Sequence, residues 1–75
     1  MVRVLFFGQI ADIAGVREIH AEASDTQSLL ANLVEKYPPL QNAVFALAVN
    51  RITVHTNTKL SALDEVALLP PYSGG

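Results

Sequence analysis

The sequence predicts a small α+β domain in which one helix lies across a sheet. Three observations lead to this fold class: a single strongly amphipathic stretch in the middle of the chain, apolar β-branched runs near both ends, and a length of 75 residues. This length suits one domain. Because the chain has no cysteine, it can form no disulfide, thiolate metal site or cysteine nucleophile.

The first part of the chain is predicted to form a central strand, a short helix and an edge strand. Residues 2–7 are rich in β-branched and aromatic side chains and are apolar on both faces except at Arg3, which is typical of a central strand. In residues 9–14 apolar side chains recur at helical spacing, and Gly15 stands at the C-cap position. Residues 18–23 alternate in polarity, as a half-exposed edge strand does.

The strongest helical signal lies in the middle of the chain. Residues 24–27 match a capping box, and Pro38 ends the helix at Tyr37 because a residue before proline avoids the helical region. Such an amphipathic helix covers a sheet. Its apolar stripe consists of Leu29, Leu30, Leu33, Val34 and Tyr37.

The second half is predicted to add a hairpin after a loop of residues 39–42. Residues 46–49 and 52–55 are two apolar or β-branched runs on either side of Asn50-Arg51. Because Asn tolerates a positive φ, a hairpin turn fits there. Residues 57–64 are mostly polar and turn-like.

The last predicted strand, residues 65–69, completes the order of a β-grasp: a mixed sheet of four to five strands crossed by one main helix. The first and last strands are the most apolar, so they are expected side by side in the middle of the sheet. The whole chain, 1–75, is then one domain with an extended tail, 70–75. Since the two strands run the same way, this tail leaves the sheet at one edge of the body, where a partner can reach it.

Charge and hydropathy exclude two classes of function. The net charge is −2 and the five basic residues are scattered, so the chain has no electrostatic footprint for nucleic acid. Its apolar runs are far shorter than the ~20 residues that span a bilayer, and it has no signal-peptide pattern. The expected location is cytoplasmic. Charged residues make up 16% of the chain against about 25% on average, which suggests an uncovered apolar surface for a partner.

The side chains that usually catalyse form no recognisable site. His20 and His55 belong to separate predicted strands, without a second ligand at metal-binding spacing. Asp64 and Glu65 are adjacent, so in an extended segment they point to opposite faces. No glycine-rich phosphate loop or nucleophile–base pattern is visible. The folded body is therefore predicted to be a carrier or adaptor without a metal.

The C-terminal tail has a group that can be made reactive, which the folded body lacks. Pro70 and Pro71 hold it extended, and Gly74 and Gly75 present bare backbone. The carboxyl group of Gly75 is an anion at neutral pH and must be activated before it reacts. Adenylation by ATP on another enzyme would make it electrophilic. A sulfide or persulfide donor would then give a thiocarboxylate, and an amine would give an amide.

The chain resembles the small, sulfur-carrying subunits of molybdopterin synthase, a ubiquitin-like β-grasp family, over its whole length. The most specific block is Asp64-Glu65-Val66-Ala67, two apolar residues, Pro70-Pro71, two residues and Gly74-Gly75. The family often has a glycine before the acidic pair, where this chain has Leu63. Further matches are Val4-Leu5-Phe6-Phe7 and Ala48-Val49-Asn50.

The resemblance implies a non-catalytic subunit that donates sulfur within a sulfurtransferase complex. A ubiquitin-activating-like adenylyltransferase would use ATP to adenylate Gly75, and the carrier itself would bind no cofactor. As a thiocarboxylate, the tail would enter the large subunit in a heterotetramer and pass its sulfur to cyclic pyranopterin monophosphate. The apolar patch that holds the large subunit in this family corresponds to Phe7, Leu60 and Leu69, for which a place in the ordinary core is the alternative.

Three other functions remain open at this stage. One is a sulfur carrier for thiamine or a related thiolated product, and another is a protein modifier joined through Gly75 to lysines. The third is an interaction module in which the Gly-Gly end has no chemical role.

Overall fold

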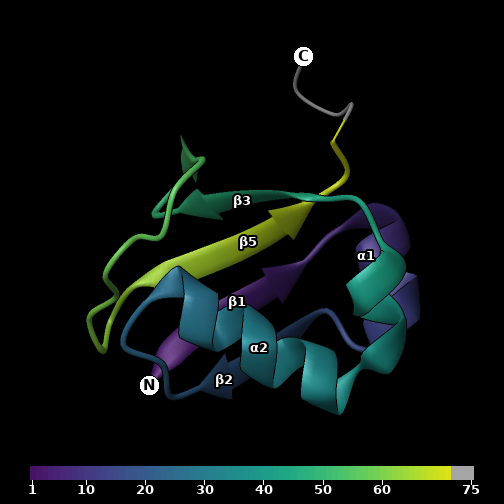
Figure 1. The fold of residues 1–75 in the computed structure, drawn as a ribbon, viewed down its shortest axis with the longest axis horizontal. Helices are drawn as coiled ribbons and strands as arrows, with labels where there is room; N and C mark the ends of the chain where they lie inside the picture. Colours follow the sequence, from purple (N-terminus) through teal and green to yellow (C-terminus); the bar gives the residue numbers. More distant parts are fainter. Residues whose placement is uncertain (72–75) are drawn as a thin grey trace.

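The computed structural model, which describes residues 1–71, contains a five-stranded mixed sheet in the order β2-β1-β5-β3-β4. Figure 1 shows α2 lying across one face of this sheet. The predicted fold class, one helix across a mixed sheet, is confirmed. The elements are β1 (Val2–Phe6), α1 (Gly8–Ala14), β2 (Glu18–Ala21), α2 (Thr26–Lys36), the 3₁₀ helix η1 (Pro38–Asn42), β3 (Ala46–Val49), β4 (Ile52–Val54) and β5 (Glu65–Leu69).

The first and last strands lie side by side in the middle of the sheet, as their composition predicts. They are parallel, with Val4 opposite Val66 and Phe6 opposite Leu68. The other neighbours are antiparallel: β2 on β1, β3 on β5, and β4 on β3. Because β1 and β5 run in the same direction, they end at the same end of the sheet, from which the chain continues into Pro70 (Figure 1).

The core lies between the sheet and the layer formed by α1, α2 and η1. Alternate strand residues face it, because successive side chains of a strand point to opposite faces. Tyr37, at the end of α2, packs edge-on against Phe6 with 5.8 Å between the ring centroids. The buried cluster consists of Val2, Val4, Phe6, Ile10, Leu29, Leu33, Leu40, Val49, Val66 and Leu68.

The start of α2 differs from the predicted capping box. The N-cap is Asp25, whose carboxylate accepts a 2.8 Å hydrogen bond from the backbone N–H of Ser28. Ser24 lies one residue before this cap, and its carbonyl accepts from the N–H of Leu60. Asn57, in the loop after β4, accepts from the N–H of Gln27. The first turn of α2 is thus completed by a loop distant in sequence.

The segment after α2 is also more ordered than predicted. Residues 39–42, expected as a loop, belong to the 3₁₀ helix Pro38–Asn42. Proline at its start is compatible with the first turn, where an N–H has no helical partner. Its one buried residue is Leu40, which belongs to the core cluster. The sequence did contain a signal for this 3₁₀ helix: the apolar residue Leu40 directly follows Pro38-Pro39.

The predicted hairpin turn is confirmed, and it is tied to the start of β5. Asn50 and Arg51 have φ values of 51° and 71°, the left-handed pair that a two-residue hairpin turn requires. The Asn50 amide donates to Asp64 Oδ1, and its oxygen accepts from the N–H of Glu65, both at 3.0 Å. The acidic pair therefore has a structural role at the turn.

The turn from residue 61 to residue 64 explains how leucine occupies position 63. The Asp64 carboxylate accepts from the N–H of Ser61 at 2.7 Å, and the Asp64 N–H donates to the Ser61 carbonyl. Among the non-glycine residues of the described chain, positive φ occurs at Asn50 and Arg51 alone. The turn therefore needs no glycine at Leu63.

Asp64→Asn is expected to lower stability at neutral pH and to make the loss of stability in acid shallower. Hydrogen bonds from the Asn50 amide and the Ser61 N–H hold the pKa of Asp64 below its ordinary value. The ionised form thus stabilises the fold above the unfolded aspartate pKa of about 3.9, and this contribution is lost as the pH falls through the lower folded value. Asparagine has no such titration.

Urea unfolding followed from neutral to acid pH measures both effects. Asp12→Asn, at an exposed position of α1, is the control for removing one carboxylate. Parallel stability curves for the two variants would show that the hydrogen bonds to Asp64 contribute nothing.

Candidate functional site

The face of the sheet turned away from α2 has an apolar centre. Leu5 of β1, Ala67 of β5 and Ala48 of β3 lie opposite one another in register, and Phe7 and Leu69 follow at the ends of β1 and β5. These five residues, here called the outer-face patch, line a hollow of about 440 Å³. The two alanines are small enough to form its floor. Its rim consists of Arg3, Arg51, Thr53 and Glu65.

The structure brings two of the three predicted interface residues together. Phe7 is 44% exposed, and Leu69 is half-buried beside it. The backbone holds them in place, because the N–H of Phe7 donates to the carbonyl of Leu68 at 3.1 Å. An exposed phenylalanine in an apolar hollow is typical of a protein-binding surface rather than of a core.

Leu60, the third predicted interface residue, lies elsewhere. It is half-buried and packs against the core cluster, and its N–H joins the loop to Ser24. It does not line the hollow of the outer-face patch. A role for Leu60 at an interface remains a prediction.

The predicted tail begins at the patch. Pro70 follows Leu69 directly and lies against Gly8 so closely that a Cβ on Gly8 would come within 2.8 Å of the Pro70 Cγ. Pro71 is exposed. Gly74 and Gly75, on which the predicted chemistry depends, lie outside the described residues.

Charged side chains form ion pairs at one end of the patch. The Arg3 guanidinium contacts Glu18 with two nitrogens, each at 3.1 Å, and Glu65 at 3.4 Å. The hydrogen bond from Arg3 lowers the pKa of Glu18. Arg51 reaches the other oxygen of Glu65 at 4.0 Å. Arg3, Glu65 and Arg51 thus form a connected row of alternating charges on the rim.

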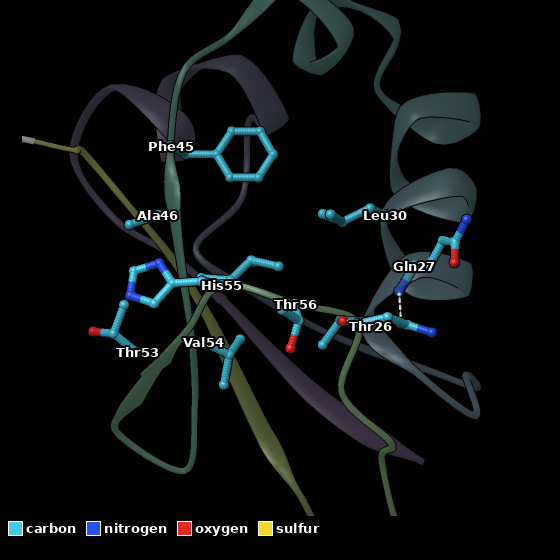
Figure 2. A pocket seen from close by; sticks show the side chains of 11 residues that line it. Thr26, Gln27, Leu30, Phe45, Ala46, Thr53, Val54, His55 and Thr56 are labelled. Carbon is cyan, nitrogen blue, oxygen red and sulfur yellow. Dashed lines mark hydrogen bonds between the residues drawn. The ribbon is translucent and has the colours of Figure 1, made fainter.

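A second hollow, of about 560 Å³, opens between α2 and the β3–β4 hairpin. Figure 2 shows Leu30 pointing from α2 toward the strands, with Phe45 and Val54 on the opposite wall. His55 is the one titratable side chain that lines it. A single imidazole without an acid, base or nucleophile beside it assembles no catalytic site.

The two histidines lie far apart in the sheet. His20 lies in β2 and His55 follows β4, and these strands form opposite edges of the sheet. Within residues 1–71, no group of three or more histidine or acidic side chains could hold a metal ion. In the same residues, no helix has the length and hydropathy needed to cross a membrane.

The sequence interpretation missed three members of the outer-face patch, Leu5, Ala48 and Ala67. The available signal was the alternation of the two middle strands. Once Val4 and Val66 are assigned to the core, their neighbours Leu5 and Ala67 must face outward. The patch lies where the chain leaves the sheet at Pro70, and an exposed apolar surface of this kind is suited to docking this chain onto another protein.

Comparison with known proteins agrees with this arrangement. The sequence model described as the ThiS family matches residues 4–75. The molybdopterin synthase sulfur carrier subunit of Chlamydomonas reinhardtii is 36% identical, with 99% of this chain and 98% of that protein covered.

Solved structures share the fold over nearly the whole chain. Small archaeal modifier protein 1 from Methanosarcina acetivorans has a TM-score of 0.86 at 26% identity, covering 99% of this chain and 95% of that one. A complex of subunits 1 and 2 of molybdopterin-converting factor from Helicobacter pylori gives 0.76 at 34% identity, covering 99% and 97%. Both comparisons place this chain among ubiquitin-like β-grasp proteins.

Proposed function

The chain belongs to the ThiS family, and from this premise we propose that it is the sulfur-carrying small subunit of a molybdopterin synthase. The observation that carries the proposal is the juxtaposition of Phe7 and Leu69 in one exposed apolar hollow at the point where Pro70 leaves the sheet. A docking surface and a reactive tail are thereby joined. The relative named a molybdopterin synthase sulfur carrier subunit supports molybdopterin synthase, rather than a thiamine pathway, as the place where this carrier acts.

The covalent chemistry belongs to the carboxyl group of Gly75. A carboxylate oxygen attacks the α-phosphorus of ATP on an activating adenylyltransferase, and pyrophosphate leaves. Sulfide then attacks the carbonyl carbon of the acyl-adenylate, and AMP leaves to give the thiocarboxylate; with a persulfide donor, a thiol reductant cleaves the S–S bond. Glycine suits both attacks because it has no side chain beside the carbonyl.

The body of the protein positions this chemistry without taking part in it. The outer-face patch binds the large subunit, and the tail extends from its edge toward the pterin substrate. The carrier needs no bound cofactor, since ATP is consumed on the activating enzyme. The solved complex of two molybdopterin-converting factor subunits supports a large-subunit partner, and a heterotetramer in the cytoplasm is the proposed assembly.

Intact mass measurement of the protein isolated from its native cell tests the proposal. A species heavier by the replacement of one oxygen with sulfur, located by fragmentation at Gly75, is expected. That species should convert cyclic pyranopterin monophosphate to the dithiolene when the large subunit is added. A carrier that is thiocarboxylated but supports only thiazole formation would identify the thiamine branch of sulfur carriers instead.

A second candidate function, a protein modifier, is favoured by the similarity to small archaeal modifier protein 1. In that case the activated Gly75 carbonyl would be attacked by a lysine amine to form an isopeptide bond. Conjugates that survive reducing, denaturing gels and contain a Gly-Gly remnant on lysine would support this function. A thiocarboxylate alone, without conjugates, would support sulfur transfer alone.

Replacing Pro70 and Pro71 together by glycine is expected to slow sulfur transfer by roughly 4- to 30-fold. Each proline restricts the free chain, an effect worth about 0.4–1 kcal/mol of free energy, and the two effects add. The tail must then lose more freedom on entering the large subunit. Pro71→Gly alone separates this effect from the contact between Pro70 and Gly8. Single-turnover dithiolene formation at saturating large subunit is the measurement, and rates equal to the parent would exclude a role for tail stiffness.

A further inference from the structure

One large apolar side chain outside the outer-face patch is almost fully exposed at an ordered position. Leu63 is 96% exposed, although the turn that contains it is fixed by hydrogen bonds between Ser61 and Asp64. The side chain does not belong to the core cluster. Isolated exposed leucines are common, so its surroundings decide whether it has a role.

Those surroundings connect Leu63 to the docking surface. Leu63 lines a hollow of about 300 Å³ together with Arg3, Asn50, Arg51 and Glu65. Arg3, Arg51 and Glu65 also form the rim of the hollow over the outer-face patch. The two hollows therefore lie next to each other, with this row of charges as their common wall.

Arg51 is the member of this row of charges whose guanidinium a partner can reach. Its side chain is 90% exposed, and its contact with Glu65, at 4.0 Å, is longer than the 3.4 Å contact that Arg3 makes with the same carboxylate. Its position is well defined, because the hairpin turn is tied to β5 through the side chain of Asn50. An exposed guanidinium beside an exposed leucine is complementary to a partner surface on which a carboxylate stands beside an apolar side chain.

We propose that the docking surface extends past the outer-face patch to Leu63 and Arg51, and that this extension binds the large subunit where an apolar side chain stands next to a carboxylate. The proposal rests on the proposed function and adds a second contact to it. Leu63 supplies buried apolar area, and Arg51 supplies a charge contact at the rim. In this arrangement the tail leaves one end of the interface and Leu63 anchors the other.

Two substitutions test the extension. Leu63→Asn is expected to raise the Kd for the large subunit roughly 5- to 30-fold, the effect of truncating a well-packed interface side chain. Arg51→Asn keeps a residue that tolerates positive φ and should slow association at low ionic strength, with the difference vanishing at high salt. Surface plasmon resonance with the large subunit immobilised measures both quantities.

Matched controls separate docking from folding and from net charge. Val44→Asn replaces another exposed apolar side chain, and Lys59→Asn removes another exposed cation; neither residue lines the two hollows. Both controls should bind as the parent does, and thermal unfolding should be unchanged in Leu63→Asn. Leu63→Asn and Arg51→Asn variants that bind like these controls would overturn the proposal.

Phe7→Arg in the same assay separates this inference from the proposed function. If Phe7→Arg abolishes binding while the Leu63 and Arg51 variants match their controls, the extension fails and the sulfur-carrier function stands. If the parent chain does not bind the large subunit, the proposed function fails and the extension fails with it. Loss of binding to the activating enzyme alone would also contradict the extension.

Discussion

Phe7→Arg is expected to weaken binding of this chain to the large subunit by roughly 30-fold or more, the loss that follows removal of an interface hot spot worth about 2 kcal/mol. The aromatic ring projects from the end of β1 into the hollow shared with Leu69, and docking would bury it. A guanidinium placed there must lose hydration when the partner covers the hollow, and this loss costs binding free energy. Two cations, Arg3 and Arg51, already lie on the rim of the same hollow.

The exposure of Phe7 makes this substitution a test of docking rather than of folding. At 44% exposed, its side chain is outside the buried cluster, so the unfolding transition of the variant should lie close to that of the parent. Val44→Arg, at an exposed valine that does not line the hollow of the patch, is the matched control for introducing arginine. Isothermal titration calorimetry with the large subunit gives the affinities. Equal affinities for the parent and the Phe7 variant would remove Phe7 from the interface.

The sequence predicted the arrangement of strands well, because periodicity and composition carry it. Val4 and Val66 belong to runs that are apolar on both faces, and such runs are expected in the middle of a sheet. They are in register in the structure. The left-handed turn at Asn50 was predictable for a similar reason, since few residues tolerate positive φ.

The sequence could not predict contacts that depend on distant segments meeting. The capping-box pattern is local, yet the cap of α2 is Asp25, and Asn57 completes the first turn from the loop after β4, about 30 residues further along the chain. The role of Asp64 also requires the hairpin at Asn50 to lie beside it. A local sequence pattern can indicate such hydrogen bonds, but the tertiary fold determines which donor lies within reach of which acceptor.

The candidate site was predictable in part, for the same physical reason. Phe7 and Leu69 meet because β1 and β5 are parallel neighbours, which the apolar character of both strands implied. Leu60 was grouped with them by family resemblance alone, and the structure packs it against the core. The extension at Leu63 depends on the fold of three separate segments, so it has no signature in the linear sequence.

Deletion of Gly75 is expected to abolish sulfur transfer while leaving folding and docking unchanged. The residue has no side chain to contribute to the core, and it lies beyond the proposed docking residues in the sequence. Deletion leaves a carboxyl group of similar reactivity on Gly74. The tail is nevertheless shorter by one residue, about 3.3–3.6 Å when extended.

That shortening is as large as the distance over which the reaction must occur. Reacting atoms held on a protein must approach within about 3–3.5 Å in the productive orientation, and a docked body cannot move forward to compensate because the outer-face patch fixes its position. The truncated carrier should therefore compete with the full-length carrier for the large subunit without forming product. Ser73→Ala, which keeps the length of the tail, is the control and should remain active. Dithiolene formation is measured after each variant is offered to the activating enzyme and a sulfur donor; substantial product from the truncated carrier would falsify the assignment of the reacting carbonyl to Gly75.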